Sequence, residues 1–191
     1  MAFKDIIKKT RTYRKFDSTY KISKNDLIDL IDNAHFSASH GNTQTLRYLI
    51  YNDEQNNTKI FSSLKWAASL PNWDGPIPSE RPTAFIIILS KNINNYTFCD
   101  AGISMQTIML SATEKKLGGC IFASIDKEKL QKDMEIDDIY KILYVIALGK
   151  PIEKVQLEVA SKNLKYWRDE KDIHHVPKIP TKNLILNIEK E

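Results

Sequence analysis

Two arginines stand three positions apart near the start of the chain, and a hydroxyl lies between them. These are Arg11 and Arg14, with Thr12 between them as a further hydrogen-bond donor. A guanidinium group donates two parallel hydrogen bonds to a phosphate and keeps its charge at any working pH. The segment is therefore a candidate phosphate site, although a solvated basic turn after a short helix explains the same residues.

Two later segments carry groups that suit a flat, polar ring. Asn42 and Gln44 each offer an amide donor and an acceptor, and in a strand their side chains would share one face. Gly118 and Gly119 have no Cβ, which lets the main chain approach a ligand closely. An ordinary polar turn also explains the amides, and a helix end also explains the glycines.

Together the three segments describe a ligand with a phosphate at one end and a hydrogen-bonding ring at the other. Flavin mononucleotide (FMN) is such a ligand, and its ring carries the redox chemistry, so we name no catalytic side chain. Lys178, on an extended C-terminal segment, either reaches the phosphate or faces water. Trp73, in the proline-rich loop 71–82, either lines the acceptor pocket or is a packed indole.

The composition argues against other classes of protein. With 191 residues, 42% of them hydrophobic and 27% charged, the chain predicts one globular domain. The net charge of +4 is spread over alternating signs, so we expect no nucleic-acid-binding face. We expect no secretory signal and no membrane span. Cys99 and Cys120 form no paired motif, and a reducing cytoplasm is the simplest setting.

Motifs for rival chemistries do not occur in the sequence. The six glycines build neither Gly-x-Gly-x-x-Gly nor a phosphate loop, which argues against a Rossmann-type nicotinamide site. Neither His-Glu-x-x-His nor Gly-x-Ser-x-Gly occurs. The adjacent His174 and His175 would face opposite ways on an extended chain, so we predict no metal site.

Hydrophobic periodicity predicts alternating helices and strands in a mixed α+β layer architecture. Gly118 is expected to end the long, buried helix that begins at Asp100, and the tail is expected to run extended over residues 173–180. The first predicted helix begins near Phe3, the second follows the cap residue Ser23, and the others cover residues 60–68, residues 100–116 and a segment from Asp126. The predicted strands cover residues 42–50, 84–89, 120–123, 142–148 and 184–188.

Five segments in this order resemble the nitroreductase family of flavoproteins, and the resemblance runs over nearly the whole chain. The segments are Arg11-Thr12-Tyr13-Arg14-Lys15-Phe16, Ser39-His40-Gly41-Asn42-Thr43-Gln44, Asp100-Ala101-Gly102-Ile103-Ser104-Met105-Gln106, Leu117-Gly118-Gly119-Cys120 and Leu148-Gly149-Lys150-Pro151.

The resemblance implies a central mixed, largely antiparallel sheet flanked by helices. It also implies a homodimer with two FMN sites at the interface, and a C-terminal extension over residues 150–191 that packs on the partner. In that arrangement Arg11, Thr12 and Arg14 hold the phosphate and ribityl end, Asn42 and Gln44 meet the ring, and Gly118 and Gly119 pass beside it.

The family resemblance further implies a ping-pong reaction in which NADH or NADPH reduces the flavin and a nitroaromatic, a quinone or a related acceptor reoxidises it. Two alternatives remain open: a protein of the same fold that acts on the flavin itself or dehalogenates an aromatic, and a basic binding module. Three positions depart from the family's usual residues, namely Thr10, Thr45 and Ile179, where an arginine, a proline and an arginine are common.

Overall fold

The computed structural model describes residues 1–67, 70, 73–161 and 163–187, which fall into two compact units. One unit comprises residues 1–66 and 75–152, and the other comprises residues 67–74 and 153–191. The C-terminal part of the second unit therefore begins three residues after the start of the predicted C-terminal extension, and residues 67–74 also belong to this unit. A single domain over residues 1–191 stays a prediction.

The first unit alternates helices and strands in the order that the sequence predicts. None of the helices in the described part of the chain is long and apolar enough to cross a membrane. The elements are α1 (Phe3–Lys9), α2 (Lys24–His35), β1 (Leu46–Tyr51), α3 (Glu54–Phe61), β2 (Ala84–Ser90), α4 (Thr97–Glu114), β3 (Gly118–Phe122), α5 (Lys127–Asp133) and β4 (Lys141–Gly149), with short 3-10 turns at His40–Asn42 and Pro78–Glu80.

The four strands of this unit form one antiparallel sheet in the order β1-β2-β4-β3. At one end of the sheet Gly118 pairs with Gly149, and Ala84 pairs with Leu148. At the opposite end the first residue of β1, Leu46, pairs with Ser90. This arrangement confirms the predicted α+β class with a largely antiparallel sheet flanked by helices.

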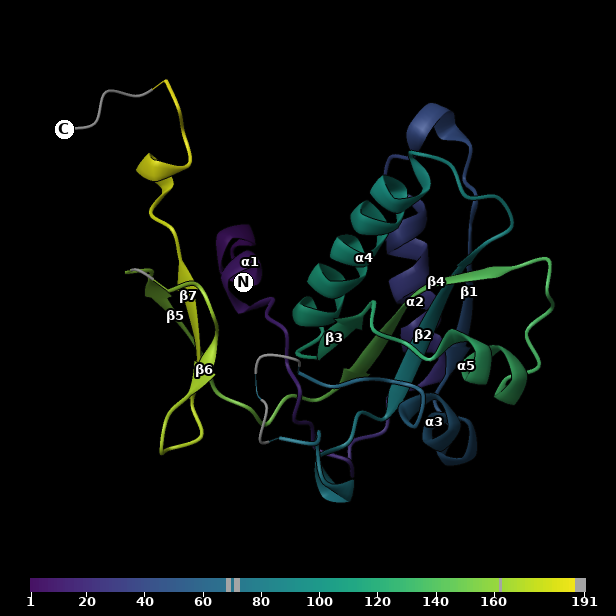
Figure 1. Cartoon of the computed structure of the whole chain (residues 1–191), viewed down its shortest axis with the longest axis horizontal. Coiled ribbons are helices and arrows are strands. Elements are labelled where there is room, and N and C mark those ends of the chain that lie inside the picture. The colour runs from purple at the N-terminus through teal and green to yellow at the C-terminus, as the bar shows by residue number, and fades with distance from the viewer. Residues whose placement is uncertain (68–69, 71–72, 162, 188–191) are drawn as a thin grey trace. The chain divides into compact units, whose positions relative to one another are not determined.

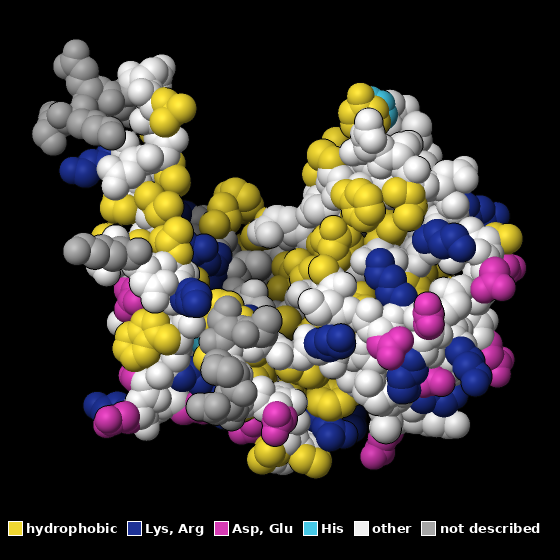
Figure 2. All heavy atoms as spheres, viewed as in Figure 1, with side chains coloured by type: hydrophobic (Ala, Val, Ile, Leu, Met, Phe, Trp, Pro, Cys, Tyr) yellow, Lys and Arg dark blue, Asp and Glu magenta, His cyan; other side chains and the backbone are white. Residues whose placement is uncertain are grey.

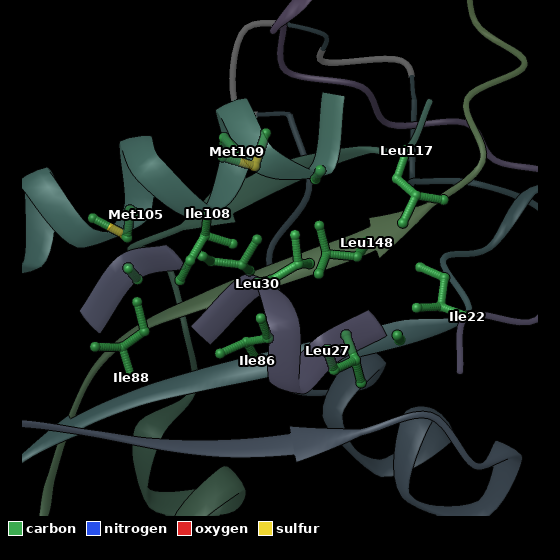
Figure 3. Packing of buried hydrophobic residues seen from close by; sticks show 14 of the residues in the cluster. Ile22, Leu27, Leu30, Ile86, Ile88, Met105, Ile108, Met109, Leu117 and Leu148 are labelled. Carbon is green, nitrogen blue, oxygen red and sulfur yellow. The ribbon is translucent and has the colours of Figure 1, made fainter. Parts of the chain in front are cut away.

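Helices cover both faces of the sheet, as Figure 1 shows. Alternate residues of β2 supply the two cores, because successive side chains of a strand point to opposite faces. Ile86 packs with Leu30 of α2 and Ile108 of α4 in the cluster of Figure 3, whereas Ile87 packs with residues of α3 and α5. Every residue of β2 is buried, as its continuous apolar run predicts.

The helix predicted over residues 60–68 begins and ends earlier. The Asp53 side chain caps α3 by accepting a hydrogen bond from the Asn56 amide, so the helix starts at Glu54. It ends at Phe61, and Leu64 forms an isolated β-bridge instead of a further helical turn. Ala68, at the end of the predicted helix, lies outside the described residues.

The expected role of Gly118 as a helix stop is wrong. The helix α4 ends at Glu114, and Lys116 takes the left-handed conformation, with φ of 62°. Gly118 is already the first residue of β3, so this strand begins two residues before the predicted Cys120. The close packing around Gly118, described below, explains why a glycine stands there.

The long helix α4 is buried on the side that faces the sheet and exposed on the other. Met105, Ile108 and Met109 are buried, but Phe98 is 49% exposed and Ile103 39% exposed. The prediction of a helix buried on most sides is therefore wrong for the isolated chain. Figure 2 shows hydrophobic side chains gathered over this helix.

The second unit is built on a small three-stranded sheet in the order β5-β7-β6. Its strands are β5 (Val155–Val159), β6 (Trp167–Arg168) and β7 (His174–Lys178), and β7 confirms the extended chain expected there. The strand predicted over residues 184–188 is wrong in its described part. A 3-10 turn at Thr181–Asn183 precedes Leu184, and residues 184–187 join no strand; Ile188 lies outside the described residues.

Candidate functional site

The arginine segment lies along the edge of the sheet, beside the paired glycines. The Tyr13 amide donates a hydrogen bond of 2.9 Å to the Gly119 carbonyl, and Thr12 forms a parallel bridge with Gly119. The next turn of chain is also tied down, because the Phe16 amide donates to the Glu80 carbonyl at 2.9 Å. The fold thus brings together two of the three predicted ligand-binding segments, although they are more than 100 positions apart in the sequence.

Both glycines are required by the packing of the chain itself. A Cβ on Gly118 would lie 2.5 Å from Tyr13 Cδ2 and 2.6 Å from Pro151 Cγ, and one on Gly119 would lie 2.6 Å from the Ala147 carbonyl oxygen. Contacts this short force a neighbouring group to move. The predicted close approach of a ligand to the main chain here stays a prediction, and the glycines already have a packing reason to be present.

The arginine side chains are partly withdrawn from water. Arg14 is only 8% exposed. Arg11 Nη2 donates a hydrogen bond of 2.9 Å to the Ile7 carbonyl, and Arg11 Nε is buried without an acceptor among the described residues. Burial lowers the pKa of the Arg11 guanidinium, because desolvation disfavours the charged form. Buried positive charge of this kind attracts an anionic partner.

Asn42 and Gln44 lie side by side, but in a turn and not in the predicted strand. Asn42 and Gln44 both have positive φ, 55° and 47°, in the turn that precedes β1. Gln44 Nε2 donates a hydrogen bond of 3.1 Å to Asn42 Oδ1, so the two amides still lie side by side. The strand explanation is wrong, because left-handed residues do not alternate between two faces.

Helix α4 and strand β1 hold this turn in place. The His40 amide donates to Asp100 Oδ1 at 2.9 Å, and the His40 ring stacks on Tyr96 with 3.5 Å between ring centroids. Arg47 Nη1 donates to the Gln44 carbonyl at 2.9 Å. The turn that carries the amides is therefore fixed by contacts on both sides.

A cavity of 500 Å³ opens beside the amide turn, between the end of α2, the start of β1 and α4. Tyr48 and Ser104 line it and share a hydrogen bond of 2.8 Å. Burial raises the pKa of Tyr48, and the Ser104 hydroxyl partly offsets this rise. Thr45 Oγ1 is buried there without a hydrogen bond to any described residue. The strand predicted over residues 42–50 includes Tyr48, but alternation in a strand does not reveal a cavity.

The arginine segment and the amide turn lie at opposite ends of the sheet. Gly119 is on the edge strand β3 at the end that holds Ala84, whereas Gln44 precedes β1 on the other edge, at the end that holds Ser90. Six residue steps of β2 between these ends span roughly 20 Å at ~3.4 Å per residue. One ring system bound beside Gly119 cannot also meet the amides of the same chain.

Lys178 and Trp73 both belong to the second unit. Lys178 is the exposed last residue of β7 and pairs with Val159 of β5. The Trp73 ring lies 4.7 Å from the guanidinium carbon of Arg168, which is a cation–π contact. Their predicted roles at the phosphate and in a substrate pocket stay predictions.

A histidine of the second unit is held between two carboxylates. His175 Nδ1 lies 3.1 Å from Glu158 Oε2, and Nε2 lies 3.2 Å from Asp169 Oδ2. The hydrogen bond with Asp169 raises the pKa of His175, burial opposes the rise, and Glu158 adds to it. The Trp167 ring stacks on the imidazole with 4.1 Å between centroids. Over the described residues no cluster of three or more His, Cys, Asp or Glu side chains is placed to hold a metal ion.

The sequence of this chain is similar to that of a known protein family. Residues 7–150 match the sequence model of the nitroreductase family. No curated protein matches the chain.

Solved structures with the same fold are numerous but distant in sequence. A nitroreductase family protein from Clostridium novyi NT is 22% identical, with 79% of this chain and 86% of that chain covered and a TM-score of 0.66. An FMN-dependent nitroreductase from Clostridium difficile R20291 is 18% identical, with 78% and 87% covered and a TM-score of 0.64. A variant of the FMN- and NADPH-dependent nitroreductase from Sphigopyxis sp. strain HMH is 12% identical, with 80% and 89% covered and a TM-score of 0.65.

The environment of His175 predicts a pH-dependent stability. A raised pKa means that the folded state binds the proton more tightly than the unfolded state does. The stabilisation is therefore complete below the unfolded-state pKa of about 6.5 and is lost as the pH rises through the higher folded-state pKa.

We expect His175→Gln to flatten the decline of the urea unfolding midpoint over this pH window. The control His35→Gln, at the exposed end of α2, keeps the decline. Equal pH slopes for wild type and His175→Gln would contradict the assignment.

Proposed function

The chain belongs to the nitroreductase family, and from this premise we propose that it is an FMN-dependent oxidoreductase that passes electrons from NADH or NADPH to a nitroaromatic, a quinone or a related acceptor. Similar folds occur in nitroreductases described as FMN-dependent and as FMN- and NADPH-dependent. The proposed reaction is ping-pong, with the nicotinamide and the acceptor using one pocket in turn.

One observation carries this proposal: the arginine segment is hydrogen-bonded to the main chain of Gly119. A dianionic phosphate at Arg11 and Arg14 would supply the acceptor that Arg11 Nε lacks among the described residues. Thr12 is exposed beside them and adds a hydroxyl donor. The donor set at this edge therefore suits the phosphate end of FMN, with the flavin ring directed along the Gly118–Gly119 main chain.

We propose that the amides reach the flavin from a second copy of the chain. Asn42 and Gln44 lie at the far end of the sheet from Gly119, so they complete a site on a partner and not on their own chain. The exposed apolar side chains of α4, which include Phe98 and Ile103, support a homodimer because such exposure is unfavourable in water. In this arrangement Asn42 and Gln44 of the partner subunit hold the polar edge of the ring.

The residues of the chain bind and orient, and the bound FMN supplies the hydride chemistry. The guanidinium groups of Arg11 and Arg14 would hold the phosphate. The Gly118–Gly119 main chain would lie beside the ring. The amides of Asn42 and Gln44 provide the donors and acceptors that fix the ring's rotation.

The first test is the colour of the purified protein and its response to a reductant. We expect the protein to be yellow, or to take up one FMN per chain, and to bleach when NADH or NADPH is added without oxygen. Adding a quinone should then restore the absorption. A colourless protein that takes up no FMN would overturn the proposal. A flavin that stays oxidised with both nicotinamides would leave FMN binding in place and reject the reductase.

The phosphate anchor predicts a specific loss of affinity. Arg14→Ala removes a charge-assisted hydrogen bond, so we expect FMN to bind more weakly by about 1.5–3 kcal/mol, or about 10- to 150-fold in Kd. Flavin fluorescence titration measures this change. The exposed Lys132→Ala, on α5, serves as a charge-matched control and should bind FMN normally. Circular dichroism verifies that Arg14→Ala folds. Unchanged FMN affinity in a folded Arg14→Ala would place the phosphate elsewhere.

The proposed dimer makes a separate prediction. Ile103→Glu places a charge among the exposed apolar side chains of α4, so burial of that carboxylate in the proposed interface should weaken the dimer by at least ~3 kcal/mol, roughly a hundredfold in Kd. Sedimentation velocity should show monomers, and FMN should be lost with the partner's amides. Ile139→Glu changes another exposed isoleucine, 50% exposed before β4, and should leave the dimer intact. A dimeric, yellow Ile103→Glu protein would show that this face is not the interface.

A further inference from the structure

A second cavity, of 220 Å³, lies on the α3 side of the sheet and contains none of the proposed flavin-binding residues. Its wall is formed by residues of α3, by Lys21 and by the segment that leads into β2. The Thr83 amide donates to the Leu148 carbonyl at 3.0 Å, which places this segment beside β4. The Gly119 edge is one further strand away, so the two sites are separated by two strand spacings, roughly 10 Å.

Two cationic side chains line this cavity, and neither forms an ion pair with an acidic side chain among the described residues. The Arg81 guanidinium carbon lies 4.2 Å from the centre of the Phe61 ring, and among the described residues Arg81 makes neither a hydrogen bond nor an ion pair. Lys21 Nζ donates only to the Ser18 carbonyl, at 3.3 Å, within the same described part of the chain. Glu54 is the one carboxylate among the lining residues, and it forms no ion pair with either cation.

Three buried polar atoms at this cavity lack hydrogen-bond partners among the described residues. They are Arg81 Nε, Asn57 Oδ1 and Thr83 Oγ1. Thr83 is only 5% exposed. Asn57 cannot turn its amide freely, because its Nδ2 already donates to the Thr83 carbonyl at 2.8 Å. Native proteins leave few buried polar atoms unsatisfied, and three at one cavity indicate a missing partner.

We propose that this cavity binds a small oxyanion, a carboxylate or a phosphate, that also carries a hydroxyl or amino donor. The planar fork of Arg81, held in place by Phe61, binds the oxyanion, and Lys21 adds charge at the mouth. The Thr83 hydroxyl donates to the oxyanion, and Asn57 Oδ1 accepts from the ligand's own donor. The volume is below the 300–1,000 Å³ typical of sites for drug-sized ligands, so the ligand is a small metabolite and not a nucleotide.

The test uses the full chain loaded with FMN, so that the flavin's own phosphate occupies the Arg11–Arg14 segment. Inorganic phosphate and acetate are titrated separately by calorimetry, with sodium chloride keeping the ionic strength constant. We expect saturable binding of at least one of these anions, and the one that binds identifies the oxyanion as phosphate or carboxylate. Arg81→Gln should weaken the binding at least tenfold, and Thr83→Val, which keeps the side-chain shape, should weaken it severalfold.

Two control variants separate this site from other cationic surface. Lys132→Gln removes an exposed charge elsewhere, and Arg14→Ala, titrated with FMN in saturating excess, impairs the proposed flavin anchor; both should bind the anion as wild type does. Amide resonances of Asn57 and Thr83 should shift on titration in wild type and stay fixed in Arg81→Gln. The proposal is overturned if neither anion binds, if a folded Arg81→Gln binds as tightly as wild type, or if the loss of affinity follows Arg14→Ala instead.

Discussion

The hydrogen bond from the Tyr13 amide to the Gly119 carbonyl is the contact on which the candidate site depends. An edge strand presents unpaired main-chain groups, and these need a partner. In this chain the segment after α1 supplies that partner along β3, and Phe16 then packs completely buried against Gly149. The arginines are consequently fixed at the rim of the sheet, where they can meet a ligand.

The position of the arginine segment on the β3 edge determines how the amide turn can contribute to a site. Because the sheet separates the amide turn from the arginine segment by the length of a strand, one ligand cannot reach both segments of a single chain. In the homodimer that we propose, a symmetric pair of chains would join each segment to its complement on the partner, as a twofold interface does. In that proposal the exposed apolar side chains of α4 form part of the surface between the two chains.

Buried guanidinium groups link the two ligand sites that we propose. Arg11 and Arg81 each have a Nε atom that is withdrawn from water and without an acceptor in the described part of the chain. Each is oriented by a contact within its own chain, Arg11 through the Ile7 carbonyl and Arg81 through the Phe61 ring. Such arginines are prepared for an anion before it arrives, because the side-chain ordering is complete in the folded chain. The arginine segment lies along the β3 edge of the sheet, and the other site lies on the α3 side.

The sequence by itself determined the order of helices and strands in the first unit, the buried character of β2, and which residues carry charge or amide groups, because periodicity and side-chain chemistry are local properties. It misplaced the end of α3 and the role of Gly118, since tertiary packing decides whether Leu64 continues a helix or bridges a strand, and which atoms surround a glycine. It also predicted a terminal strand where residues 184–187 form none. Only the tertiary structure decided that Asn42 and Gln44 meet through left-handed backbone and that Arg81, Asn57 and Thr83 share one cavity. These facts arise from contacts between residues distant in the chain, which no local pattern encodes.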